Sequence, residues 1–241
     1  MSELICTLWP PGGPEPRPGA EIVLDSAESR HLVKARRVRA GARVWAAVGD
    51  GRGVRCVLEE DDREAARLRA EEVVTQWREP RLRVSLALGM VRPRHMETAL
   101  TEGTSLGMHR FIPLLTERVE YQRWRPERWD RLRSEAVKQC ARGWIPPVEE
   151  PHTLPELLDT FAGTDLLVGG EEAPRTLREV ADHEGLDAKH EVLVVIGPEG
   201  DLTPGERALL EERGASSFRM GGRRLRSETA ALAALSLLLA D

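Results

Sequence analysis

Cysteine and long apolar stretches are scarce in this chain of 241 residues. Its three cysteines, Cys6, Cys56 and Cys140, lie far apart in the sequence. This spacing excludes a disulfide scaffold and a CxxC zinc site, and it favours a reducing, cytoplasmic setting. The longest apolar run, residues 230–240, is interrupted by Ser236, whereas a membrane span needs roughly 20 apolar residues. Because the first residues also lack a basic segment followed by an apolar stretch, we expect neither a signal peptide nor a membrane span.

Lysine is also scarce, and arginine carries almost all of the positive charge. Lysine and arginine together number 35 and aspartate and glutamate 40, so the formal net charge is −5. This balance excludes a globally basic nucleic-acid-binding protein but leaves room for local basic patches. Lysine occurs only at positions 34, 138 and 189. Arginine suits the recognition of phosphate and of planar groups, although a GC-rich genome would encode the same bias.

The first part of the chain is expected to form a small β-rich domain. Its predicted strands lie at residues 21–24, 43–47 and 54–58. Asp50 and Gly51 stand between the second and third of these strands, and this pair is typical of a β-hairpin turn. The sequence therefore predicts a β-barrel over residues 1–75. A boundary near Pro80 separates it from a second domain over residues 80–241.

Beyond this boundary, strand and helix signals alternate. The predicted strands lie at residues 83–88, 110–113, 166–168, 192–196 and 217–220. Three helices are predicted to begin with capping boxes, in which a threonine and a glutamate three residues later satisfy backbone N–H groups. These threonines are Thr153, Thr176 and Thr203. Expected helix ends are marked by Gly107, Gly185 and Gly214. Alternation of this kind predicts an α/β domain with a largely parallel sheet.

Three glycine-rich loops follow predicted strands of this second domain. They occupy residues 169–172, 197–200 and 221–226. A glycine at such a place either turns the chain or lets backbone groups approach a ligand closely. Ligands of open parallel sheets bind beyond the carboxyl ends of the strands, so three successive loops favour a shared pocket. None of them carries the Gly-Lys-Ser/Thr of a phosphate-binding loop, and the chain lacks GxSxG and HExxH motifs.

Two further segments have an unusual composition. Residues 30–43 hold six basic residues and no acidic one, which indicates either a phosphate-binding strip or a solvated helix face. The segment 230–240 is apolar on every face of a helix. Such a helix must be buried all round, either within its own domain or partly against a partner subunit.

Five segments together resemble the motifs of one family. Residues 196–206 resemble the GPEGG…E signature of a SPOUT-class methyltransferase family, and residues 220–230 resemble its LGxRILRxETA signature. Similarity to EAxxQxxR, ELGV…P…(S/T)ERS and HLxxVLRxxxGD is found at residues 135–142, 106–118 and 31–41. By these motifs the chain resembles the RsmE-type 16S ribosomal RNA uracil-N3 methyltransferases, over about residues 30–230. It departs from the family pattern at Arg92, Glu102, Ser105, Asp201 and Arg224.

The resemblance implies an enzyme that uses S-adenosylmethionine, without a metal, to methylate N3 of a specific uridine in 16S rRNA of the small ribosomal subunit. It also implies a SPOUT-type, trefoil-knotted α/β domain with a parallel sheet, preceded by a PUA-like β-barrel that binds RNA, and a homodimer. The residues expected to bind the cofactor are Val168, Gly169, Gly170, Ile196, Gly197, Pro198, Glu199, Gly200, Met220, Gly221, Leu225, Arg226, Ser227 and Thr229.

The chemistry of uracil suggests roles for several charged residues. N3 carries a proton at neutral pH, and its loss places negative charge on N3, O2 and O4. A guanidinium stabilises such an anion, and we predict this role for Arg226 or Arg142. Glu199 and Glu228 are candidates for the general base, unless they only organise their loops. The residues expected to contact RNA are Arg36, Arg37, Arg39, Arg118, Gln139, Arg142 and Arg223.

Two other functions fit the same residues. The first is a non-catalytic RNA-binding or ribosome-assembly protein that keeps the fold, and measurable binding of S-adenosylmethionine would distinguish it. The second is a SPOUT methyltransferase that acts on another RNA, such as a transfer-RNA ribose methyltransferase. The predicted N-terminal barrel and the EAxxQxxR segment argue against transfer RNA as the substrate.

Overall fold

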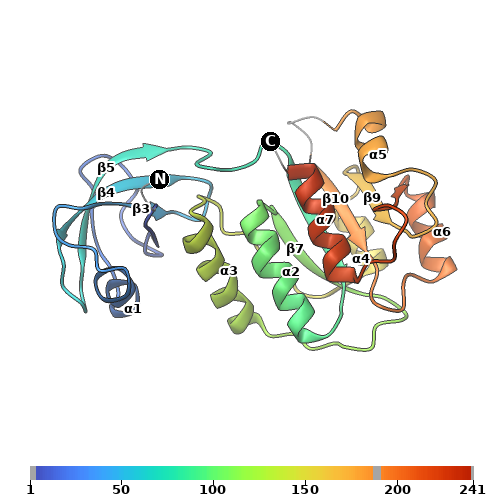
Figure 1. Cartoon of the computed structure of the whole chain (residues 1–241), viewed down its shortest axis with the longest axis horizontal. Helices are drawn as coiled ribbons and strands as arrows, with labels where there is room; N and C mark the ends of the chain where they lie inside the picture. Colours follow the sequence, from blue (N-terminus) through green and yellow to red (C-terminus); the bar gives the residue numbers. More distant parts are fainter. Residues whose placement is uncertain (1–3, 187–190, 240–241) are drawn as a thin grey trace. The chain divides into compact units, whose positions relative to one another are not determined.

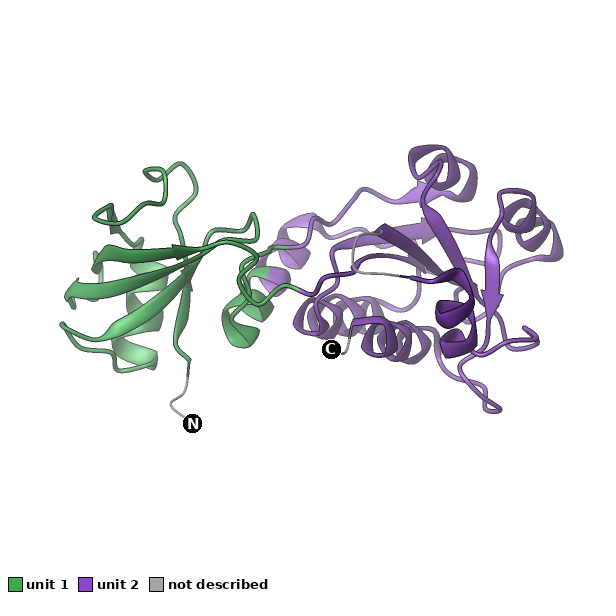
Figure 2. Ribbon diagram, turned by 90° about the horizontal axis from the view of Figure 1, so that it is seen from above, with its two compact units in different colours: residues 1–79, 134–145 green, residues 80–133, 146–241 purple. Residues whose placement is uncertain are grey.

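The computed structural model describes residues 4–186 and 191–239, and Figure 1 labels many of its helices and strands. The chain divides into two compact units, which Figure 2 colours separately. They comprise residues 1–79 with 134–145 (unit 1) and residues 80–133 with 146–241 (unit 2). None of the helices in the described part of the chain has the length and apolar character that a membrane-spanning segment requires.

Unit 1 is built on a five-stranded sheet. Its strands are β1 (Cys6–Leu8), β2 (Glu21–Val23), β3 (Arg43–Ala47), β4 (Gly53–Glu60) and β5 (Arg67–Val74), in the order β1-β3-β4-β5-β2. β1 pairs with β3 in parallel, and the other pairs are antiparallel. The predicted hairpin is confirmed, because β3 and β4 are joined through Asp50 and Gly51. The φ angle of Gly51 is +94°, a left-handed conformation that favours glycine.

The core of unit 1 forms where alternate strand residues turn inward. Val44, Cys56 and Leu68 are at most 1% exposed and share one apolar cluster. A short helix α1 (Ser26–Ser29) continues into a π-helical turn η1 (Arg30–Ala35). Leu32 and Val33 of this turn are buried in the same cluster, so η1 is anchored to the sheet by its apolar face.

Helix α3 (Pro126–Cys140) is shared between the units, because unit 1 includes residues 134–145. Val137 and Ala141 are buried in a small cluster with Ala47 and Trp77 of unit 1. The sequence assigned this segment to the second domain, since it follows that domain's elements along the chain. Its apolar residues instead complete the core of unit 1.

Unit 2 is built on a six-stranded sheet. Its strands are β6 (Arg83–Gly89), β7 (Arg110–Leu115), β8 (His152–Thr153), β9 (Asp165–Gly169), β10 (Glu191–Ile196) and β11 (Ser216–Phe218), in the order β11-β9-β10-β6-β7-β8. All of these pairings are parallel, which confirms the predicted parallel α/β sheet. The sequence did not predict β8, which is only two residues long. The knot implied by the resemblance stays a prediction.

Helices cover both faces of this sheet. They are α2 (Pro93–Leu106), α4 (Leu154–Thr160), α5 (Leu177–Glu184), α6 (Pro204–Glu212) and α7 (Ser227–Leu239). Val192 and Val194 of β10 lie in the apolar cluster that holds buried residues of α2, α5 and α7. Leu193 and Val195 lie in the cluster that holds residues of α4 and α6. The central strand is therefore buried on both faces, as a continuous apolar run requires.

The helix boundaries follow the predicted capping signals. The reciprocal capping box is present at α4, α5 and α6, starting from Thr153, Thr176 and Thr203. Gly107 and Gly185 cap α2 and α5 in left-handed conformations, and Gly214 follows the C-cap Arg213 of α6 with φ +83°. Helix α7 extends to Leu239, and Ala240 lies outside the described residues. The chain does not bury α7 all round, because Leu237 is 46% exposed.

Candidate active site

A cavity of about 370 Å³ lies where β9, β10 and β11 of unit 2 end. The three glycine-rich loops border it, so the sheet brings together segments that lie far apart along the chain. Its lining residues are Gly169, Gly170, Glu171, Ile196, Gly197, Pro198, Glu199, Asp201, Phe218, Arg219, Met220, Gly221, Arg223, Arg224, Leu225, Arg226, Ser227 and Ala230.

Hydrogen bonds join the first loop and the segment that follows it to residues 218–219, which lead into the third loop. The Gly170 N–H donates to the Phe218 carbonyl at 2.8 Å, and the Arg219 N–H donates to the Arg175 carbonyl at 2.9 Å. The Arg219 guanidinium also donates to the Ala173 carbonyl at 3.0 Å. These bonds use backbone groups that would otherwise lack partners at the ends of the strands. They hold two walls of the cavity in a fixed relation.

The second loop is held against neighbouring elements. The Asp201 N–H closes a turn by donating to the Pro198 carbonyl at 2.9 Å. Arg118, after β7, donates from Nη1 to the Gly200 carbonyl at 2.9 Å. Gly89, the last residue of β6, lies so close that a Cβ there would be 2.4 Å from the Pro198 nitrogen. The strand can approach this loop only because residue 89 has no side chain.

The glycines of the first and third loops have different surroundings. A Cβ on Gly169 would lie 2.7 Å from Cδ1 of Ile196, so a larger residue here would require the end of that side chain to shift. At Gly221 and Gly222, no atom of the described residues lies within 4 Å of the Cβ position. Gly221 also has φ +119°, where L-amino acids with side chains are rare. Gly221 therefore lines the cavity with bare backbone.

Cationic side chains surround the third loop. Arg223 and Arg226 are exposed and line the cavity, and neither forms an ion pair with any residue that the structure describes. Arg224 has its Nε 3.9 Å from Oε2 of Glu171, and both of these side chains are well exposed. The rim of the cavity therefore holds guanidinium groups that are available to an anionic ligand.

Most of the residues expected to bind the cofactor line the cavity, with three exceptions. Val168 is 2% exposed in the core of the sheet, Gly200 contacts Arg118, and Thr229 is exposed on α7. Sequence reasoning did not select some cavity residues for the cofactor: Glu171, Asp201, Phe218, Arg219, Arg223, Arg224 and Ala230. Apart from Phe218, which ends β11, they lie within glycine loops or directly adjoin selected residues, and that adjacency is the signal that could have found them.

The four predicted catalytic residues have different surroundings. Arg226 and Glu199 line the cavity. Glu228 does not, and its Oε1 lies 2.6 Å from Nδ1 of His95, which joins the first turns of α7 and α2. Arg142 belongs to unit 1, whereas the cavity is lined by residues of unit 2. Sequence reasoning overlooked His95, because no local pattern pairs it with a glutamate 133 residues away.

Arg142 is part of a buried ion pair within unit 1. The side chains of Arg142 and Glu79 are 4% and 7% exposed. The Arg142 Nε donates to Glu79 Oε2 at 3.1 Å, and Nη2 donates to the same oxygen. The Trp144 N–H donates to Oε1 of Glu79 at 2.8 Å. Arg142 therefore holds together the segments around residues 79 and 144.

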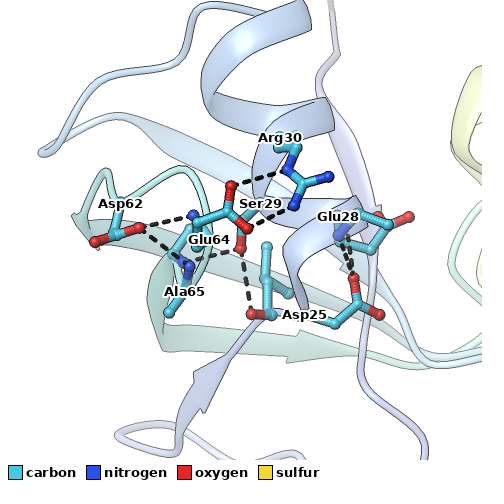
Figure 3. Close-up of polar contacts among 10 residues, drawn as sticks. Asp25, Glu28, Ser29, Arg30, Asp62, Glu64 and Ala65 are labelled. Carbon is cyan, nitrogen blue, oxygen red and sulfur yellow. Dashed lines mark hydrogen bonds and ion pairs between the residues drawn. The ribbon is translucent and has the colours of Figure 1, made fainter.

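Unit 1 neutralises part of the basic strip at residues 30–43. Figure 3 shows Arg30 of η1 reaching Glu64, with Nε–Oε1 and Nη2–Oε2 distances of 2.9 and 2.6 Å. The hydrogen bond from Arg30 lowers the pKa of the Glu64 carboxyl. Arg43 pairs with Glu71 at 2.9 Å. The ends of the strip therefore carry little net charge, and its middle remains basic.

Three of the predicted RNA-contacting residues of unit 1 lie in this middle part, whereas Gln139 lies on α3 and Arg142 lies just after it. Arg37 is exposed, with φ +58°, and Arg36 is half-buried. Arg39 is exposed and has its Nη1 3.8 Å from Oδ2 of Asp61. Gln139 is exposed near the end of α3. Among the described residues of both units, no three His, Cys, Asp or Glu side chains are grouped as a metal site would require.

Comparisons with known proteins match both units of the chain. Residues 78–239 match an RNA methyltransferase domain, and residues 24–71 match an RNA methyltransferase PUA domain. The ribosomal RNA small subunit methyltransferase E of Mycobacterium bovis is 31% identical over 233 residues, which cover 91% of this chain and 86% of that protein. The protein of the same name from Bacillus subtilis is 28% identical and covers 88% of this chain and 86% of its own length.

A solved structure shares the fold across nearly the whole chain. The ribosomal RNA small subunit methyltransferase E of Neisseria gonorrhoeae, bound to S-adenosyl methionine, superposes with a TM-score of 0.86 at 23% identity. The match covers 98% of this chain and 96% of that one. Both domain matches, and the 31% identity over most of the length, place the sequence in one family. This chain belongs to the ribosomal RNA small subunit methyltransferase E family.

Proposed function

We propose that this protein transfers a methyl group from S-adenosylmethionine to N3 of a uridine in 16S rRNA of the small ribosomal subunit. The observation that carries the proposal is the cavity of about 370 Å³ between three glycine loops, edged by Arg223 and Arg226. The family indicates the substrate, because the named relatives are ribosomal RNA small subunit methyltransferases.

The residues present fit the cofactor. Side chains of Ile196, Phe218 and Leu225 offer apolar surface of the kind that an adenine ring needs. The bare backbone at Gly221 leaves room for a ligand to make direct main-chain hydrogen bonds. Bound there, S-adenosylmethionine supplies an electrophilic methyl group on a sulfonium.

Arg226 is the residue that we assign to stabilising the deprotonated uracil. It lines the cavity, carries a permanent positive charge and is free of ion pairs within the described part of the chain. It immediately precedes Ser227, the first residue of α7, so the positive end of this helix faces the same place. Both charges favour the anion that forms as the N3 proton leaves. Arg142 is assigned a structural role instead, because its guanidinium is committed to Glu79.

Glu199 is the carboxylate that we assign to accepting this proton. Its side chain is exposed at the cavity wall, whereas Glu228 is held by His95. Geometry is the first requirement of a general base, and this requirement favours Glu199 over Glu228.

Unit 1 is assigned to RNA binding through the exposed middle of its basic strip, around Arg37. A base within structured RNA must be splayed out of its stack to enter a cavity of this size. The homodimer of the family remains a prediction for this chain. Sedimentation equilibrium would check it, with Leu237→Glu as the variant expected to weaken association through the exposed side of α7.

The test is methyl transfer from isotopically labelled S-adenosylmethionine to small ribosomal subunits isolated from a strain that lacks the enzyme. Nucleoside mapping should then find N3-methyluridine at one position of 16S rRNA. Binding of subunits without incorporation of label would favour the non-catalytic alternative. In a parallel reaction with transfer RNA from the same strain, label in the ribose would favour the other SPOUT activity. Either result would refute the proposal.

A further inference from the structure

Asp201, which directly follows the second glycine loop, has an unusual backbone conformation. Its φ angle is +61°, and it is one of only five non-glycine residues with positive φ in the described part of the chain. The GPEGG signature that this segment resembles has glycine here, and glycine adopts such angles freely. Aspartate adopts such angles more readily than most residues with side chains but less readily than glycine, so contacts of its side chain help to hold this conformation.

The Asp201 side chain makes those contacts with two partners. Its Oδ1 accepts a hydrogen bond from the Leu202 N–H at 2.8 Å. Both carboxylate oxygens accept from Nη2 of Arg207, at 2.6 and 2.7 Å. Oδ1 also lies beside Gly197, because a Cβ added to that glycine would be 3.1 Å from Oδ1. The carboxylate thus lies across the turn that forms the second loop.

Arg207 extends this contact to the first loop. It lies on α6, and its Nη1 would be 2.9 Å from a Cβ on Gly170, so the guanidinium occupies the space beside that glycine. Gly170 and Asp201 both line the cavity. Arg207 is only 28% exposed, and it links the two loops through Asp201. The first loop and the segment that leads into the third loop are already joined by backbone hydrogen bonds, and this ion pair holds the end of the second loop.

We propose that Asp201 and Arg207 are a positioning pair, which holds the second glycine loop in the conformation that receives S-adenosylmethionine. The proposal deepens the proposed function and rests on it. The Arg207 and Asp201 side chains are 28% and 49% exposed, and a partly exposed ion pair contributes little to global stability. Its effect should instead be local, because Asp201 without Arg207 loses a contact that stabilises its positive φ angle. The ion pair thus stabilises, at Asp201, a backbone conformation that glycine adopts without support.

The test measures affinity for S-adenosylmethionine by calorimetry, with melting temperature and amide exchange measured on the cofactor-free protein. Arg207→Ala should weaken binding about fivefold to tenfold and speed exchange of the Leu202 amide, with almost unchanged melting. Arg207→Lys should recover part of the affinity, since one nitrogen donates to both oxygens. Arg213→Ala is the matched control, because Arg213 follows the same helix and pairs with Asp159 away from the cavity residues. It should bind like the wild type.

The decisive comparison uses the Asp201→Gly background. There, adding Arg207→Ala should cost almost no further affinity, because glycine takes positive φ without support. Equal affinity of Arg207→Ala and wild type, or an equal loss in both backgrounds, would overturn the positioning pair while leaving the enzyme assignment intact. Failure of the wild-type protein itself to bind S-adenosylmethionine would overturn the proposed function together with this inference.

Discussion

Replacing Arg142 by alanine should destabilise unit 1 rather than remove a catalytic charge. The Arg142 and Glu79 side chains are 4% and 7% exposed, so the substitution leaves a buried carboxylate without its counter-charge. Removing one partner of such a pair costs about 3–5 kcal/mol. In a unit of about 90 residues, each kcal/mol lowers the melting temperature by about 4–8 °C. We therefore expect a loss of at least about 12 °C.

Differential scanning calorimetry of the full chain measures this loss directly. A paired variant provides the control: Glu79→Gln with Arg142→Met removes both charges and keeps an oxygen for the Trp144 N–H. Replacing a whole buried pair by neutral groups is often nearly neutral, so this variant should regain most of the lost stability. If Arg142→Ala melted like the wild type and yet lost single-turnover methylation, Arg142 would act directly in the reaction and our reasoning would be refuted.

Four further predictions concern the cavity, the RNA and the thiols. Gly221→Val should weaken S-adenosylmethionine binding at least about tenfold, because valine at φ +119° is strained; unchanged calorimetric affinity would remove this loop from the site. Arg226→Ala should lower the single-turnover methylation rate by about 10²–10³ with near-normal affinities for cofactor and RNA; a near-normal rate would contradict its role. Arg37→Ala should reduce the slope of log affinity for RNA against log salt by about 0.7–0.9, and an unchanged slope would show that this side chain contacts no phosphate. Burial raises the pKa of the Cys6 and Cys56 thiols from 9.0 to about 12. The unfolded chain therefore ionises them first, and the free energy of unfolding should fall as pH rises from 9 towards 12. Urea unfolding at about pH 8 and about pH 10.5 checks this, and an equal fall in the Cys6→Ala/Cys56→Ala variant would attribute it to other groups.

The sequence alone determined those features that depend on neighbouring residues. Thr176 and Glu179 are three positions apart, so their reciprocal capping bonds form as soon as the helix does. Asp50 and Gly51 specify a hairpin turn locally, and the apolar run 192–196 specifies a buried strand of a parallel sheet. The three glycine loops were also visible locally, because each directly follows a strand that the sequence predicts.

Tertiary structure alone decided which distant residues meet. Val137 follows elements of unit 2 along the chain but is buried in unit 1, since its apolar side chain completes that core. Arg142 looked like a candidate for the anion until its pairing with Glu79, 63 residues away, was known. Likewise, only the packing of α6 beside the first loop joins Arg207 to Asp201 near Gly170. A charged side chain shows its type in the sequence, but its function depends on whether the fold gives it a partner or leaves it free.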